Sequence, residues 1–294
     1  MIIIDKLSNM KKQLLFVILI ILLINSNQNF AQNKLDKSKK ELNSGSSGKN
    51  QSSTSYSSSS GSSKSKSSSG DNIIGRAIAD IFLYATFGIF KYVIIGDYKN
   101  ENHLFSNLTP YPYYNKESGN FENSDTVSVS KNKSRFEIET NFVYENNNLY
   151  GNHLKAKIRP FQYFYLQSDF HQLFEFDKID NTNNRLSLFQ FNIGYDRIRF
   201  EKFNFGWTLG ATYVGNEVKK TGFAYGLNAE YFMGNRISFL GSGKWSRING
   251  FPVNTFELQS KFHRKNYFFS LGFEHMKIAT PNYNFITIGG GIYF

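Results

Sequence analysis

Hydrophobic and polar residues alternate with a period of two along the C-terminal half of the chain, from Arg135 to Phe294. In residues 203–213, Phe, Trp, Leu, Ala and Tyr occupy every second position, and Asn, Gly and Thr fill the positions between them. Because successive side chains of a β-strand point to opposite faces, this period is typical of strands with one apolar and one polar face. The pattern therefore predicts an all-β domain over residues 135–294.

The alternating segments are separated by polar turns, and counting them predicts about ten strands. Eight or twelve strands stay open as alternatives, because residues 152–176 could form one bent strand and residues 73–95 could add another. Short connections are expected to alternate with longer ones, as in barrels with short turns on one side of the membrane and longer loops on the other. The expected strands cover residues 135–144, 152–159, 162–176, 186–199, 203–213, 222–233, 236–248, 254–263, 267–277 and 284–294.

The two faces of these segments differ in a way that favours a membrane protein. The polar face is rich in Gly, Ser, Asn and Thr, whereas the other face is almost purely aromatic and aliphatic in a chain with 30 Phe and 18 Tyr. A soluble secreted sandwich also alternates and remains the other candidate fold. Apolar side chains facing lipid around an enclosed polar lumen explain both faces, and closing the sheet satisfies every backbone hydrogen bond. We therefore predict an antiparallel transmembrane β-barrel.

The last strand carries the most specific pattern, Ile-Thr-Ile-Gly-Gly-Gly-Ile-Tyr-Phe, with Gly290 as its one weak position. Over Arg135–Phe294 the chain resembles the outer-membrane β-barrel proteins of Gram-negative bacteria. The resemblance implies that the strand ending in Phe294 is the signal read by the barrel-assembly machinery. It also implies an outer-membrane location and contact with outer-membrane lipids. With an even number of strands, the first and the last residues of the barrel domain both lie on the periplasmic side. The resemblance identifies a class and no activity.

The first residues have the features of a secretory signal. Lys11 and Lys12 precede an apolar run over residues 14–24, and the small residue Ala31 follows a short polar stretch. A spanning helix needs about 20 apolar residues, so a run of this length is too short to be kept as an anchor. We predict a signal peptide over residues 1–31 and a chain that leaves the cytoplasm.

The next stretch, residues 32–70, is predicted to be a disordered linker rich in Ser, Gly and Lys that lies in the periplasm. It is interpreted as a spacer, with a basic tether to an envelope protein or to peptidoglycan as the alternative. Residues 1–70 carry +7 of the formal net charge of +11. The remainder is nearly balanced, which argues against a nucleic-acid partner.

Residues 71–134 form the third predicted region, an apolar helix-like segment followed by an irregular loop. The apolar run over residues 73–95 has helical spacing but contains Arg76, Asp80 and Lys91. An ionised side chain at the bilayer centre costs about 2.5–3.5 kcal/mol on insertion scales, so we expect this helix to lie on the membrane surface or against the end of the barrel.

Charged residues on the polar face are predicted to form pairs inside the lumen. A hairpin centred near residue 148 pairs Glu137 with Arg159 and Glu139 with Lys157. Turns near residues 250 and 265 align Lys244, Glu257 and Glu274 across three neighbouring strands. We interpret these groups as mutually neutralising charges that fill a narrow lumen, with an ion-selectivity ring as the alternative.

Motifs for catalysis or for cofactor binding are absent from the sequence. There is no cysteine and no glycine-rich phosphate loop, and the five histidines show no metal-ligand spacing. Catalytic, cofactor and metal sites are therefore all predicted to be absent. We expect a non-enzymatic outer-membrane barrel with a structural, adhesive or envelope-complex role. A small-solute channel is the first alternative. A lipid-modifying enzyme with Ser and His at the outer rim is the second, although His275 is expected to face lipid.

Overall fold

A computed structural model describes residues 33–45, 90–115, 118–122, 134–177, 182–234 and 236–294. The predicted signal peptide, most of the predicted linker and residues 73–89 of the apolar segment lie outside the described residues. The chain divides into two compact units, Met1–Lys34 and Leu35–Phe294, and the fold below is that of the second unit.

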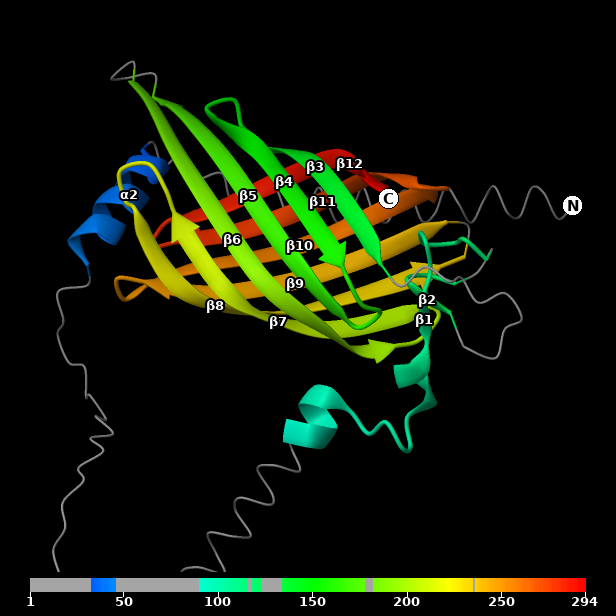
Figure 1. The fold of residues 1–294 in the computed structure, drawn as a ribbon. Coiled ribbons are helices and arrows are strands. Elements are labelled where there is room, and N and C mark those ends of the chain that lie inside the picture. Colours follow the sequence, from blue (N-terminus) through cyan, green and yellow to red (C-terminus); the bar gives the residue numbers. More distant parts are fainter. Residues whose placement is uncertain (1–32, 46–89, 116–117, 123–133, 178–181, 235) are drawn as a thin grey trace, which may run out of the picture. The chain divides into compact units, whose positions relative to one another are not determined.

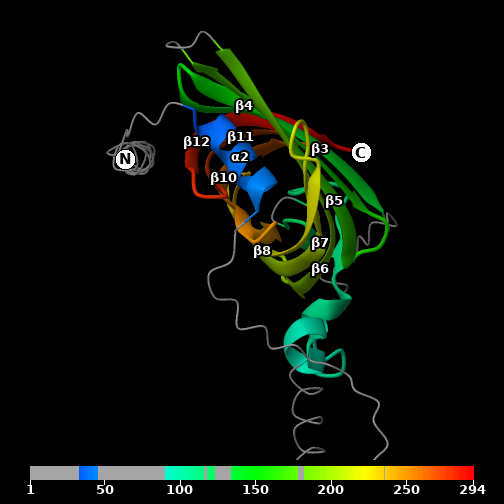
Figure 2. The ribbon, with the colours of Figure 1, turned by 90° about the vertical axis from the view of Figure 1, so that its left-hand side faces the viewer.

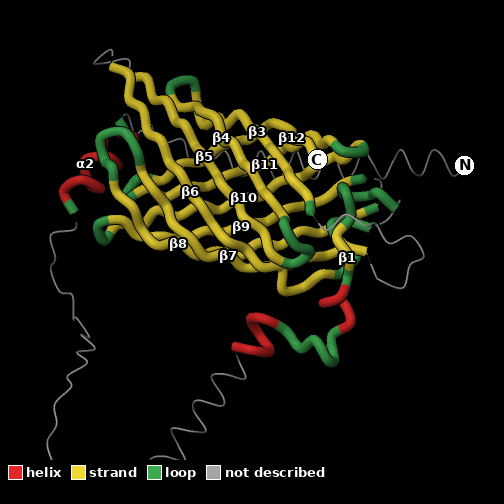
Figure 3. Tube along the Cα trace, in the orientation of Figure 1, coloured by secondary structure: helices red, strands yellow, loops and turns green. Residues whose placement is uncertain are grey.

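Ten antiparallel strands form a closed barrel in which each strand pairs with the next along the chain (Figures 1 and 3). The last strand pairs with the first, so the sheet has no open edge. The predicted ten-strand barrel is confirmed. Its strands are β3 (Arg135–Asn146), β4 (Leu149–Arg159), β5 (Phe164–Asp177), β6 (Thr182–Arg199), β7 (Phe203–Val214), β8 (Lys220–Met233), β9 (Ile237–Ile248), β10 (Phe251–Arg264), β11 (Tyr267–Ile278) and β12 (Asn282–Tyr293).

At the end of the barrel opposite to the start of β3 and the end of β12, the connections between strands are shorter than predicted. The strands continue beyond the alternating segments through polar residues, since backbone pairing outside the apolar belt does not need an apolar face. Strand β6 is 18 residues long for this reason. Between β9 and β10 the predicted loop over residues 249–253 shrinks to Asn249 and Gly250, whose φ angles of 52° and 83° suit a two-residue hairpin turn.

The barrel is apolar outside and polar inside. Phe223 and Phe269 on the outer face are 66% and 62% exposed, whereas Glu139 and Glu274 on the inner face are 2% and 0% exposed. A water-soluble sheet would show the reverse distribution. The predicted orientation, with apolar side chains toward lipid and polar side chains toward the lumen, is confirmed.

The two mouths of the barrel are occupied by segments that precede it in the chain. Helix α2 (Lys34–Ser44) lies in one mouth, which we call the α2 mouth (Figure 2). The opposite end, where β3 begins and β12 ends, is the terminal mouth. The segments near it are the π-helix η1 (Phe90–Ile95), the 3₁₀-helix η2 (Asn102–Phe105) and the short strands β1 (Asn107–Leu108) and β2 (Phe121–Glu122).

Helix α2 departs from the prediction that residues 32–70 are all linker. Its buried side chains, Leu35, Ser38, Lys39 and Leu42, form a narrow stripe on an otherwise charged helix. Such a stripe is too weak to predict a helix by itself, and the mouth of the barrel supplies the missing apolar partner. Among the described helices, none is long and apolar enough to cross a membrane.

Candidate functional site: a filled lumen closed at both mouths

The α2 mouth is closed by apolar packing. Leu35 and Leu42 are both fully buried. Burying a leucine side chain contributes about 1.5–3 kcal/mol, so two of them suffice to hold a short helix in place. They belong to a cluster that includes Val143, Leu149, Leu173, Leu186, Leu188, Val214, Val218, Ile248, Val253, Met276, Ile278, Ala279, Tyr283 and Phe285.

Hydrogen bonds fix the position of α2 on this cluster. The Leu35 backbone N–H, at the first turn of the helix, donates to Glu175 Oε2 at 2.8 Å. Ser38 Oγ lies 2.7 Å from the Tyr283 hydroxyl and donates to the Ile278 carbonyl at 2.8 Å. At the other end of the helix, Asn249 Nδ2 donates to the Leu42 carbonyl at 2.6 Å. These contacts reach the barrel wall at several strands.

The terminal mouth is closed by polar contacts from residues 106–115 and 118–122. Arg135 donates to the Thr109 carbonyl at 3.2 Å and to Asn120 Oδ1 at 2.5 Å. Asn120 in turn donates through Nδ2 to Glu230 at 2.8 Å. The segment predicted to be an irregular loop therefore folds into the barrel end through buried side-chain hydrogen bonds.

The described end of the predicted apolar segment, η1, packs against the outer face of the barrel. Trp207 Nε1 donates to the Ile94 carbonyl at 3.0 Å, and Arg197 donates to the Tyr92 carbonyl at 2.7 Å. Arg197 also binds Glu101 through both terminal nitrogens, at 2.7 and 2.9 Å. The Arg197 guanidinium holds the pKa of the Glu101 carboxyl below its ordinary value.

The middle of the lumen is filled by a charge network centred on Glu139. Lys261 lies 2.8 Å from one of its oxygens and Lys155 lies 3.5 Å from the other. Gln259 and Asn141 donate to the same carboxylate at 2.8 and 2.7 Å. Glu139 is thus compensated by two buried ammonium groups, and each charge has partners that offset the cost of removing it from water.

The register of the first hairpin differs from the predicted one by two residues. Glu137 lies across from Lys157, not Arg159, and Glu139 lies across from Lys155, not Lys157. The cause is a bulge between Tyr144 and Asn146 next to a two-residue turn, which moves every partner along the strand. Arg159 instead forms an ion pair with Asp196 on β6.

The predicted alignment of Lys244, Glu257 and Glu274 holds for only two of the three residues. Glu257 lies directly across from Glu274. Lys244 lies across from Thr255, because the turn at residues 249–250 is tighter than expected. Lys244 reaches over the lumen to Asp169 at 2.5 Å, and Glu257 pairs with Lys155.

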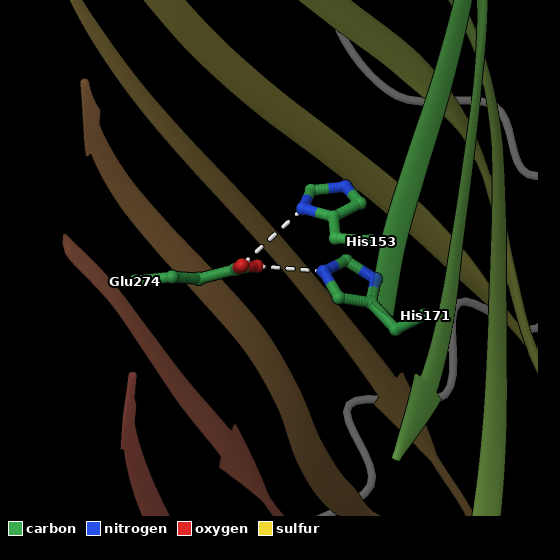
Figure 4. A group of neighbouring side chains, drawn as sticks. All are labelled: His153, His171 and Glu274. Carbon is green, nitrogen blue, oxygen red and sulfur yellow. Dashed lines mark hydrogen bonds and ion pairs between the residues drawn. The ribbon is translucent and has the colours of Figure 1, made fainter. Parts of the chain in front are cut away.

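Two histidines and a glutamate meet between the charge network and the apolar cluster (Figure 4). His153 Nδ1 and His171 Nε2 lie 3.2 and 2.6 Å from the two carboxylate oxygens of Glu274. The imidazole rings are stacked, with 3.6 Å between their centroids. His153 Nε2 lies 3.3 Å from Asp169 Oδ1. His153 and His171 are cross-strand partners on β4 and β5, and Glu274 on β11 joins them only when the barrel closes, so the sequence pattern missed this cluster.

The space left inside the charge network is small. The polar cavity lined by Glu139, Lys155, Glu257, Lys261 and neighbouring side chains has a volume of about 30 Å³. A water molecule needs about 10–15 Å³ of such space, so this cavity has room for about two or three waters. It is too small for a nutrient-sized solute.

Ser238 and His263 form a second pair that the sequence pattern did not reveal. Ser238 Oγ lies 2.8 Å from His263 Nε2 and 3.1 Å from Glu230 Oε1. In a serine hydrolase the acid orients the histidine through its other nitrogen, whereas here the carboxylate contacts the serine. Both side chains are fully buried, which keeps an acyl substrate away from them. The pair is arranged as a structural hydrogen bond.

The predicted assembly residue, Phe294, lies at the seam of the barrel. Its N–H and carbonyl both bond to Phe136, at 2.8 and 3.1 Å, so the last residue of the chain fastens the last strand to the first. Its ring is 66% exposed. Recognition of this strand by assembly machinery stays a prediction.

No protein-family model and no curated protein match the sequence. Several solved structures are similar in fold. An outer membrane channel from Pseudomonas putida F1 has 8% sequence identity and a TM-score of 0.33, covering 59% of this chain and 99% of its own. The N-terminal β-barrel domain of Pseudomonas aeruginosa OprF has 12% identity and a TM-score of 0.29, covering 54% and 97%. The Yersinia pestis outer membrane protein Ail has 14% identity and a TM-score of 0.31, covering 55% and 98%.

The predicted resemblance to bacterial outer-membrane β-barrels is confirmed at the level of fold by the closed antiparallel barrel itself.

Proposed function

We propose that this chain is a sealed, non-enzymatic barrel of the Gram-negative outer membrane with a structural, adhesive or envelope-complex role. The observation that carries the proposal is the lumen, which is filled by the network around Glu139. The two mouths add further barriers, since α2 closes one by apolar packing and residues 106–115 and 118–122 close the other by hydrogen bonds. A solute could pass through the barrel only if the charge network and the closures of both mouths were all disrupted.

The proposed partners follow from the two surfaces of the barrel and from the sequence. Outer-membrane lipids would contact the apolar belt, and the assembly machinery would read the strand that ends in Phe294. Residues 46–70 would provide a contact with an envelope protein or with peptidoglycan. In a barrel whose termini face the periplasm, the α2 mouth opens to the exterior. The predicted periplasmic location of residues 32–70 therefore does not extend to α2, and a periplasmic contact of residues 46–70 would require the chain to return across the membrane outside the filled lumen.

Planar-bilayer recording of the purified full-length chain tests the sealed lumen. We expect no stable conductance steps, with insertion of folded barrel verified by heat-modifiable migration on gels. A stable, large conductance from the wild-type chain would contradict the proposal.

Planar-bilayer recording of the Lys244→Glu variant distinguishes a sealed barrel from a small channel. In a channel, reversal of this lumen charge should change the preference between cations and anions. In a sealed barrel, the background current should equal that of the wild type, so a selective current that reverses its preference would favour the channel.

A further inference from the structure

We propose that His153, His171 and Glu274 form a binding site for one divalent transition-metal ion, with Zn²⁺ as the best-fitting ion. This inference is independent of the proposed function, because a barrel can be sealed with or without a metal. One ligand atom from each residue lies within 4.8 Å of the other two. Two imidazoles and one carboxylate are a ligand set that suits Zn²⁺, whereas Mg²⁺ and Ca²⁺ prefer oxygen ligands.

Two of the three ligand contacts are close to the spacing of a metal site, and the stacked rings would have to rotate for both nitrogens to point at one ion. In a tetrahedral site with bonds of about 2.0–2.1 Å, neighbouring ligand atoms lie about 3.3 Å apart. His153 Nδ1 and Glu274 Oε2 are already 3.2 Å apart. His171 Nε2 is 2.6 Å from the other Glu274 oxygen, so this contact opens by several tenths of an ångström to admit the ion.

The group behind His153 is arranged as in metal sites, whereas Nδ1 of His171 has no hydrogen-bond partner among the described residues. With Nδ1 of His153 on the ion, Nε2 carries the proton and donates to Asp169, which is the carboxylate–histidine–metal arrangement. Asp169 is itself held by Lys244 at 2.5 Å and by Gln167 Nε2 at 3.1 Å. The orientation of His153 is therefore set by a partner that is fixed from two sides.

The local charge also accommodates a cation. With both imidazoles neutral, Glu274 and Asp169 contribute two negative charges against the single positive charge of Lys244. A proton on one imidazole restores balance, whereas Zn²⁺ leaves one excess positive charge, so protons and metal ions compete for the same nitrogens. Two stacked imidazolium rings would repel each other, which leaves the second ring free to act as a neutral ligand.

The position of the site indicates a structural ion. His171 and Glu274 are fully buried, and the apolar cluster under α2 separates them from the α2 mouth. No substrate could reach an open coordination position there. Strands β12 and β3 lie between β11 and β4 in the wall, so the ion would link strands that are not neighbours. It would thereby fasten the barrel across its lumen.

Metal content after refolding tests the proposal directly. The full-length chain, freed of metal with a chelator, is refolded in detergent with one equivalent of Zn²⁺, desalted and measured by mass spectrometry. We expect one bound Zn²⁺ per wild-type chain, and less than a tenth of that for His171→Gln and Glu274→Gln. His275→Gln is the matched control, because His275 lies beside Glu274 but on the outer face, 2.7 Å from Asn284. It should bind like the wild type.

Two further measurements keep the test decisive if a ligand variant fails to fold. Asp169→Asn, which keeps all three ligands, should weaken Zn²⁺ binding about 10–100-fold. Co²⁺ added to the wild type should give the visible absorption of a tetrahedral site with nitrogen and oxygen ligands. The proposal is overturned if folded wild type retains no Zn²⁺, if His171→Gln retains as much as His275→Gln, or if Co²⁺ gives no visible band.

Discussion

The two mouths of this barrel are closed by opposite kinds of interaction. At the α2 mouth, an amphipathic helix places Leu35 and Leu42 on a cluster of buried aliphatic and aromatic side chains. At the terminal mouth, residues 106–115 and 118–122 enter the lumen through hydrogen bonds to Arg135 and Glu230. The apolar closure tolerates small shifts, because the hydrophobic effect has no direction. The polar closure requires each donor to keep its acceptor.

The difference between the mouths matches the side chains that the strands offer. Inward positions of β4 change from Arg159, Lys157 and Lys155 near the terminal mouth to Leu149 at the α2 mouth. The inner wall thus changes from charged to apolar along its length. Each mouth is closed by a segment of matching polarity. Three variants below test this comparison, and a fourth experiment tests a contact outside the barrel.

The largest effect is expected from Asp196→Asn beneath the polar closure. Asp196 is the ion-pair partner of Arg159, and both side chains are buried. Removing one member of a buried pair leaves the other charge uncompensated, at a cost of about 3–5 kcal/mol in the free energy of unfolding. Urea unfolding in detergent, followed by the gel shift of the folded barrel, measures this cost. Asp36→Asn, which breaks the exposed Asp36–Lys40 pair, should change stability by less than about 1 kcal/mol. Equal effects of the two variants would contradict the buried pair.

A smaller effect is expected from Leu42→Ala in the apolar closure. Truncating a buried leucine costs about 2–5 kcal/mol, and the low end applies here because a helix at a mouth can adjust its position. Hydrogen exchange of α2 should rise while exchange in β9–β12 stays slow. Lys37→Ala, on the exposed side of the same helix, is the control. Faster exchange throughout the barrel would show that α2 is part of the core and not a separable closure.

Ser38→Ala tests how much hydrogen bonds contribute to the closure of the α2 mouth, which is otherwise apolar. The variant loses the bonds to Tyr283 and to the Ile278 carbonyl, at a cost of about 1–2 kcal/mol. Hydrogen exchange of α2 should rise less than in Leu42→Ala. A larger rise than in Leu42→Ala would mean that hydrogen bonds dominate at this mouth as well.

The smallest effect is expected from acid on the contact between Arg197 and Glu101 outside the barrel. The pKa of Glu101 is lower in the folded chain than its ordinary value of 4.5, so the carboxylate stabilises the fold above that pH. This contribution is lost as the pH falls below 4.5 through the pKa of the folded state. The protection of residues 90–105, measured as their exchange rate relative to the intrinsic rate at each pH, should therefore decrease at low pH, and Glu101→Gln should show the low protection at every pH. Protection in the wild type that does not change with pH would refute this role.

The wall of the barrel was predictable because the alternation of apolar and polar side chains is repeated along each strand. A lipid-facing strand needs an apolar side chain at every second position, and the alternation from Phe203 to Tyr213 alone places β7 to within a residue. The expected break between the strands over residues 152–159 and 162–176 contains Pro160, which lies between β4 and β5. Strand ends were less predictable, because polar residues outside the apolar belt pair as well as apolar ones.

The contents of the lumen were less predictable because they depend on register. A bulge near Glu145 changed the partner of Glu139, and the turn at Asn249–Gly250 moved Lys244 away from Glu257. The Asn-Gly pair is a known hairpin signal and could have set the second register in advance. The cluster of His153, His171 and Glu274 gave no such signal, since contacts across the lumen depend on barrel diameter and strand tilt.

Helix α2 lies in one mouth of the barrel, and the residues around Thr109 and Asn120 lie in the other. Once β12 has joined β3, the packed interior leaves no passage for a helix. In the sealed barrel that we propose, α2 would therefore have to reach its mouth before the seam between β12 and β3 forms.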